Sequence, residues 1–169
     1  MTTPSGVTSI DLLTVGAGGG GAGNLGGGGG GGQVVYQTGL VPIGNTVVTV
    51  GAGGAGGVGQ YNVTTNHGKT GVRSGLVSST LNQVALGGSG GKGRLSASNL
   101  NPDGTPINTG WTGGGAAYQD SAAQIIPDPG VGGNSFLGGA GSPNGGGGGG
   151  GAGGVGVGAG ETSTAGAGG

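Results

Sequence analysis

The sequence predicts a mostly irregular and β fold, in which a small antiparallel β element joins a bundle, or sandwich, of polyglycine II helices, with essentially no α-helix. Three observations support this fold class. Glycine supplies 56 of the 169 residues. The glycines gather in tracts that alternate with short runs rich in β-branched residues. No segment shows the capped apolar 3.6-residue period of a helix, and the one candidate, residues 115–126, would form at most one short helical turn.

A collagen triple helix or a disordered chain would explain the glycine content less well than a polyglycine II bundle. Collagen needs a glycine at every third residue and abundant proline, whereas this chain has 7 prolines and runs of consecutive glycines. Disordered chains usually combine high net charge with few β-branched residues, but the formal net charge here is −1 and clusters of Val, Ile and Leu recur. These clusters favour an ordered chain.

The predicted strands are the segments with β-branched content and alternation, in chain order 8–15, 33–38, 46–50 and 76–86. Pro42 and the Gly-Asn pair after it indicate a turn between the second and third strands. We therefore predict that 33–38 and 46–50 pair in antiparallel fashion, forming a β element at one end of the molecule.

The predicted glycine tracts are 16–23, 26–32, 51–59, 87–93 and 145–160, within a single domain that covers 1–169. An extended glycine run can adopt polyproline II geometry, with three residues per turn and no internal hydrogen bonds. Its backbone groups then need partners on neighbouring tracts, and the missing Cβ atoms let the tracts approach closely. The Ala and Val residues of the tracts are expected on outer rows or against the β element.

Composition excludes several functional classes. The chain has no cysteine, which rules out disulfides and thiolate metal sites, and four Lys and Arg residues are too few for a nucleic-acid interface. No apolar run is long enough to span a membrane, and the first residues lack the features of a signal peptide. We expect no cofactor, no nucleic-acid partner, no membrane association and no targeting to secretion.

The motifs that could indicate an enzyme are weak. "NHGKT" (66–70) resembles the end of a P-loop, but Val63 stands where the first glycine belongs and no amphipathic helix follows. His67 is the sole histidine, so a multi-histidine metal site cannot form. Asp103, Asp120 and Asp128 fit Asx turns before Gly and Pro better than catalysis. We expect that the protein is not an enzyme and has no catalytic or metal site.

The candidate partner-contact residues are Trp111, Tyr118, Tyr61 and Arg73. Aromatic and arginine side chains on loops are frequent contact residues. Trp111 is the single tryptophan, and we favour packing at the end of the glycine bundle over partner contact as its role.

The segments "VTSIDLLTVGAGGGGAG", "QVVYQTGLVPIGNTVVTVGAGGAGG", "GGNSFLGG" and "GGGGGGGAGGVG" resemble, in this order, the glycine-rich domain of tailed-phage virion proteins. The resemblance covers most of the chain and is weakest between residues 60 and 130. It implies polyglycine II bundles of the kind found at the tips of some long tail fibres, whose loops bind host receptors. The chain differs from that pattern in ending without a closing strand, so the last tract is expected to pair with a neighbouring subunit or to be cut short.

From this resemblance we expect a structural virion protein, in a fibre or as a capsid or neck decoration. The protein is expected in the virion, where it would bind other virion proteins. It is also expected to form a homo-oligomer, and a trimer is one arrangement. A receptor-binding adhesin at a fibre tip, with a host surface receptor as partner, is the alternative. An ice-binding protein and a nucleotide-binding enzyme are weaker hypotheses, since the tracts lack a strict tripeptide repeat and the P-loop match is incomplete.

Overall fold

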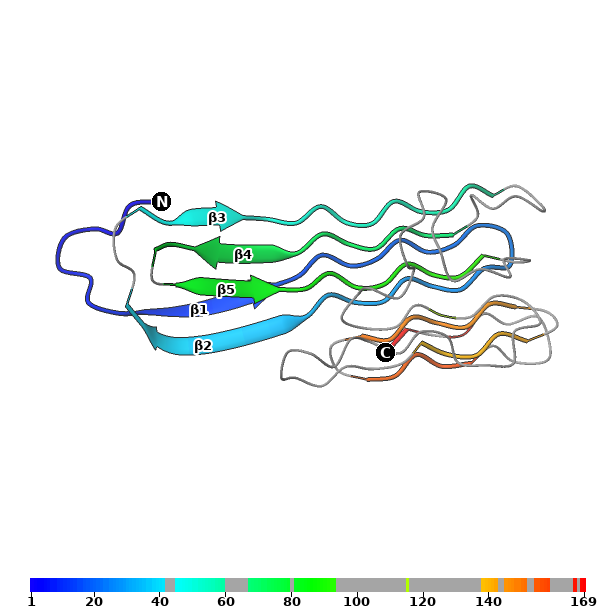
Figure 1. Cartoon of the computed structure of the whole chain (residues 1–169). Coiled ribbons are helices and arrows are strands. Elements are labelled where there is room, and N and C mark those ends of the chain that lie inside the picture. Colours follow the sequence, from blue (N-terminus) through cyan, green and yellow to red (C-terminus); the bar gives the residue numbers. More distant parts are fainter. Residues whose placement is uncertain are drawn as a thin grey trace.

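The computed structural model describes residues 1–41, 45–59, 67–79, 81–93, 115, 138–142, 145–151, 154–158, 166 and 168–169. These residues form two small antiparallel sheets and contain no helix, which confirms the predicted β and irregular fold class. The strands are β1 (Ile10–Val15), β2 (Val34–Leu40), β3 (Val47–Thr49), β4 (Ser74–Val77) and β5 (Asn82–Ala85). All five strands lie at one end, and extended segments run from them toward the other end (Figure 1).

The first sheet consists of β1 and β2, with Leu13 opposite Tyr36. Near the start of β1 the register shifts, because β2 contains one extra residue there. At this bulge Gly39 adopts a φ of 68°, and its N–H donates to the Asp11 carboxylate at 3.0 Å. A left-handed bulge residue favours glycine, so Gly39 allows β2 to keep its pairing with β1 on both sides of the bulge.

The second sheet has the order β3-β4-β5, and it corrects the prediction of one strand over 76–86. The chain reverses after Val77: the Ser78 N–H donates to the Leu81 carbonyl at 2.7 Å, and the Leu81 N–H donates to Ser78 Oγ at 3.1 Å. A serine side chain can close a turn in this way and so interrupt a strand. The run therefore forms the hairpin of β4 and β5.

The predicted pairing of 33–38 with 46–50 is wrong. β2 pairs with β1, and β3 pairs with β4. The turn that joins the first two strands lies far along the chain from them, at Asn24 and Leu25, whose φ values are 42° and 58°. The Ala22 N–H donates to the Gly27 carbonyl at 2.9 Å beside this turn. The glycine tracts thus fold back on each other and bring β1 and β2 together.

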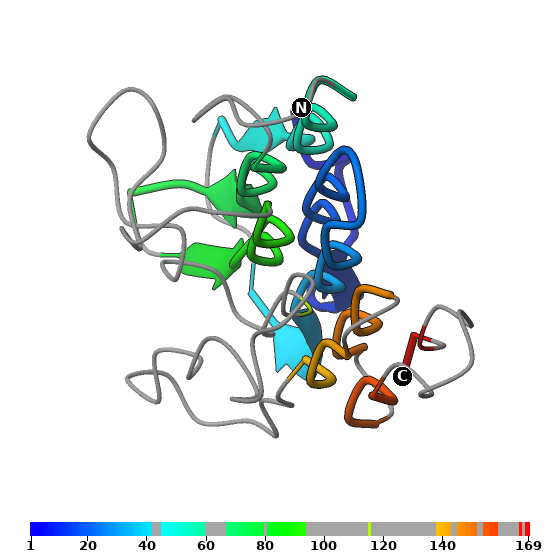
Figure 2. The same ribbon diagram turned by 90° about the vertical axis from the view of Figure 1, so that its right-hand side faces the viewer.

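Each strand is continuous with an extended segment, which we call a rod (Figure 1). Viewed from their far ends, the rods lie side by side as a bundle (Figure 2). Rod 67–73 lies outside the predicted tracts because it has glycine only at Gly68 and Gly71. The rods next to the five strands are, in chain order, 16–23, 26–32, 51–59, 67–73 and 87–93.

The hydrogen bonds between rods repeat every third residue. The N–H groups of Gly16, Gly19 and Ala22 donate to one neighbouring rod, and those of Ala17 and Gly20 donate to a second. Gly16, Gly19 and Ala22 donate to the carbonyls of Gln33, Gly30 and Gly27 at 2.8, 2.8 and 2.9 Å. Ala17 and Gly20 donate to the carbonyls of Val72 and Lys69 at 3.2 and 2.8 Å. A rod therefore bonds to neighbours on several sides, whereas a strand bonds on two.

The strand register continues without a break into the rods. Val15 lies opposite Val34, and the next residue, Gly16, donates its N–H to the Gln33 carbonyl. The side chain of Gln33 is 2 % exposed, and its Oε1 accepts a hydrogen bond from the Leu86 N–H at 2.9 Å. This buried amide joins the first sheet to the rod that follows β5, at the point where strands become rods.

Backbone packing replaces a side-chain core in the described part of the chain, where Leu76 and Ala85 are the buried hydrophobic residues. Rod 87–93 is buried along its whole length. A Cβ atom added at Gly88 or Gly91 would overlap carbonyl oxygens of a neighbouring rod. Among the described glycines positive φ occurs at Gly6 and Gly39, so the rods need glycine for close approach rather than for a left-handed backbone.

The C-terminal glycines extend the same arrangement. The Gly28 N–H donates to the Gly147 carbonyl at 2.9 Å, which places 145–151 beside rod 26–32. Segments 138–142 and 154–158 bond to 145–151 in turn, through Gly139 N–H to the Gly148 carbonyl at 2.7 Å and Gly148 N–H to the Val157 carbonyl at 3.0 Å. This second group of rods adds to the bundle on the side of rod 26–32, as Figure 2 shows.

Candidate functional site

Of the four predicted partner-contact residues, Arg73 is described, and Trp111, Tyr118 and Tyr61 lie outside the described residues. Arg73 is exposed at the entrance to β4. It lines a depression of about 360 Å³ on the outer face of the second sheet, together with Thr49, Asn82 and Val84. Gly75 lies among these residues and has no side chain to fill the depression. The arginine thus borders a shallow surface of mixed polar and apolar character that a partner could contact.

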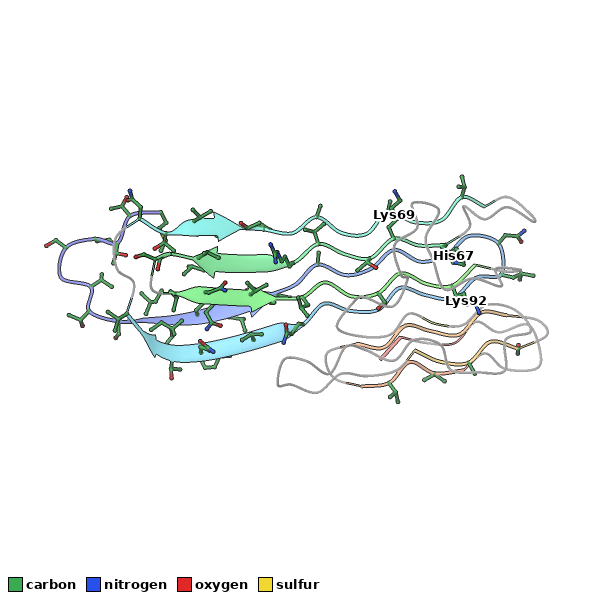
Figure 3. All side chains as sticks on the ribbon, viewed as in Figure 1. His67, Lys69 and Lys92 are labelled. Atoms are coloured by element: carbon green, nitrogen blue, oxygen red, sulfur yellow. The ribbon has the colours of Figure 1, made fainter. Side chains whose placement is uncertain are left out.

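His67 lies inside the bundle rather than in a site open to solvent. It is 4 % exposed, and its Nδ1 accepts a hydrogen bond from the Gly93 N–H at 2.8 Å. Burial, and secondly the charge of Lys92, lower the pKa of the imidazole below its usual 6.5. Figure 3 shows His67 and Lys92 on neighbouring rods, in the half of the bundle away from the strands. His67 is therefore a neutral acceptor that ties two rods together.

Residues 67–70 of the P-loop-like segment belong to rod 67–73. Two of its amides are already used, because Gly68 N–H donates to the Gly91 carbonyl at 3.0 Å and Lys69 N–H donates to the Ala55 carbonyl at 2.8 Å. A P-loop needs free backbone N–H groups that converge on a phosphate. The Lys69 side chain points out from the bundle (Figure 3). This geometry gives the segment a structural role.

The described residues include no group of three His, Cys, Asp or Glu side chains that could hold a metal ion. In the same part of the chain, no helix is long and apolar enough to cross a membrane.

An apolar surface on the first sheet was missed by the choice of candidate residues. Leu13 and Tyr36 are cross-strand partners and are 61 % and 63 % exposed. Their neighbours Val15 and Val34 form the next pair on the same face and are about half exposed. The alternation in "QVVYQT" could have found this surface, since it places Val34 and Tyr36 on one face of a strand.

Comparison with known proteins supplies the family. A model described as "Glycine-rich domain" matches residues 1–169. The chain belongs to the glycine-rich domain family. No curated protein and no solved structure matches it.

The described part of the glycine-rich domain therefore offers surfaces for contact. Contacts are available at the Arg73 depression, at the apolar face of β1 and β2, and along exposed rods. Rod 51–59 is the most open of these, since only every third residue, at Gly51, Gly54 and Gly57, is turned inward. Ala52, Ala55 and Val58 are exposed along it, as expected for the tract Ala and Val residues.

Proposed function

We propose that this glycine-rich domain is a non-enzymatic structural component of a tailed-phage virion, in a fibre or as a capsid or neck decoration. In this role a stiff bundle of polyglycine II helices holds connecting loops away from the β end. The observation that supports it best is the ladder of hydrogen bonds with a three-residue period, which ties each rod to several neighbours. Such a bundle resists bending because each rod is fixed on several sides.

The polyglycine II assignment rests on agreement of three features. The ladder period of three matches the three residues per turn of polyproline II geometry. The rods have no hydrogen bonds between their own residues, which is also a property of that geometry. Finally, the Cβ positions of the inward glycines are filled by backbone oxygens of neighbours. Close side-by-side packing of such helices requires glycine at those positions.

The virion context is supported by the resemblance of the strand and tract order to tailed-phage proteins. The direct test is mass spectrometry of purified particles from a phage that encodes the chain, with quantified peptides from 1–41. We expect the protein in particles at a constant ratio to the major capsid protein. Abundance in infected-cell lysate combined with absence from particles would contradict the proposal.

The receptor-binding adhesin is the second candidate, and one observation favours it. The turn at Asn24 and Leu25 lies at the end of the bundle opposite the strands (Figure 1), and Leu25 is 42 % exposed. An adhesin would lose host adsorption when residues 96–112 are exchanged or when Trp111 is replaced by alanine, with particle assembly intact. Unchanged adsorption by both variants would contradict the adhesin role and leave the structural role as the one remaining proposal.

A further inference from the structure

β1 has an open edge beside the second sheet. β1 pairs with β2 on one side, and no described strand pairs with its other side. The rods that continue β1 and β3 are hydrogen-bonded, since the Gly54 N–H donates to the Gly18 carbonyl at 2.9 Å. The strands themselves diverge, and no Cα atom of β1 lies within 8 Å of one in β3. A slot therefore opens between β1 and β3.

The slot is apolar and uncharged. It has a volume of about 170 Å³, and Leu12, Val48, Val50 and Leu76 line it from β1, from β3 and the residue after it, and from β4. Val48 is 52 % exposed and Val50 is 84 % exposed. Adding one strand to the open edge of β1 would cover these valines, which now contact water.

Thr14 is the polar residue that β1 contributes to the lining of the slot. The residue is 7 % exposed. Its Oγ1 is buried without a hydrogen-bond partner. This hydroxyl is enclosed by the protein itself, so the slot presents an apolar surface to an inserted strand.

The first residues of the chain already begin a strand at the entrance to the slot. The Met1 amino group donates to the Thr46 carbonyl at 2.6 Å, and the Thr46 N–H donates to the Met1 carbonyl at 2.9 Å. Successive strand residues direct their backbone groups to alternate sides, so those of Val48 face the same side as those of Thr46. The edge of β3 that faces the slot is therefore open for pairing beyond Thr46.

We propose that this slot binds an extended strand from another polypeptide chain, by addition to the open edge of β1. Its inward side chains are apolar and uncharged, which matches the lining of the slot. A single strand fits because neighbouring strands are spaced about 4.8 Å apart, whereas the β1 of a second copy would bring its own β2 with it. Strand addition gains affinity from main-chain hydrogen bonds and specificity from alternate side chains. This site is independent of the virion context.

The test uses the full chain and a dye-labelled, end-capped peptide of about eight residues, a common strand length, with alternating Val and Thr. Fluorescence anisotropy should show saturable binding. A control peptide with proline at its central valine lacks one N–H and should bind more weakly, because proline cannot donate to the ladder. If the alternating peptide does not bind, or the proline peptide binds equally well, strand addition is wrong.

Two variants of β3 localise the binding. Val48→Lys puts an ammonium group into the slot and should weaken binding about tenfold or more. Val47→Lys is the matched control, since Val47 is 65 % exposed and points to the opposite face of the same strand. Equal binding by both variants would overturn the site. Sedimentation of the free protein would also overturn it if a dimer formed that Val48→Lys abolished, because the slot would then belong to a second copy.

Discussion

At the scale of single residues, His67 links stability to pH. Its pKa is lowered by burial and by Lys92, so the unfolded chain binds the proton more readily than the folded one. The contribution of His67 to the free energy of unfolding should be fully present above pH 6.5, the pKa of the histidine in the unfolded chain. This contribution should be lost as the pH falls below 6.5 toward the lowered pKa of the folded state. Protonation would also remove the hydrogen bond that Nδ1 accepts from Gly93.

Thermal melts at about pH 8 and about pH 5, on either side of the ordinary histidine pKa, measure this effect. The matched variant is His67→Asn, whose side-chain oxygen can still accept from the Gly93 N–H but does not titrate. The difference between its two melting temperatures should be smaller than for the wild type. The same pH dependence in both proteins would show that His67 does not carry it.

Leu25 is the second residue with a testable effect on stability, because its backbone is left-handed. A left-handed conformation costs a residue with a Cβ about 1–2 kcal/mol, and its φ is 58°. Leu25→Gly should therefore raise the free energy of unfolding by about 1 kcal/mol, once the entropy of the unfolded glycine is subtracted. Leu25→Ala removes the side chain and keeps the strain, so it should not stabilise. Denaturant titration of both variants checks this difference, and equal stability would contradict the strained turn.

At the scale of elements, rod 51–59 offers two neighbouring glycines with opposite surroundings. A Cβ at Gly54 would overlap the Lys69 carbonyl oxygen, while the nearest atom to a Cβ at Gly53 is the Gly18 oxygen at 3.8 Å. We expect Gly54→Ala to destabilise by about 1–3 kcal/mol, as overpacking does. Gly53→Ala should be neutral or stabilising by up to about 1 kcal/mol. Equal melting temperatures for the two variants would mean that the tract is a linker.

Some of these elements could be predicted from the sequence and others could not. β1, β2 and β3 fall largely within the segments 8–15, 33–38 and 46–50, because alternation and β-branched content are local signals. Pairing was mispredicted because it depends on where the long rods turn, at Asn24 and Leu25, rather than on the Pro42 turn. Rod 67–73 was missed because it has glycine at only two positions, Gly68 and Gly71, where a Cβ would overlap the backbone of a neighbouring rod.

The slot between β1 and β3 and the hydrogen bond between Gln33 and Leu86 could not be predicted from the sequence, for a similar reason. Both depend on which strands lie side by side, and the register that joins sheet and rod is not encoded in any single segment. Arg73 was chosen because it is one of four Lys and Arg residues in the chain, and its role as a contact residue stays a prediction. Its depression exists because Gly75, a neighbour in space as well as in sequence, lacks a side chain.

At the scale of the whole molecule, the fold is held by backbone groups. A folded protein normally gains most of its stability from burying apolar side chains. Here two hydrophobic residues are buried in the described part of the chain, and the rods are joined by N–H to C=O bonds instead. The central claim is that the glycine tracts are ordered, hydrogen-bonded structure.

Hydrogen–deuterium exchange of assigned glycine amides tests this claim most directly. In rod 51–59 the N–H groups of Gly54 and Gly57 donate to the carbonyls of Gly18 and Gly21 at 2.9 and 2.8 Å, while those of Gly53 and Gly56 have no acceptor in the described part of the chain. We predict slow exchange at 54 and 57 and fast exchange at 53 and 56, since hydrogen-bonded amides are protected. Uniformly fast exchange at all four amides would contradict the ordered bundle.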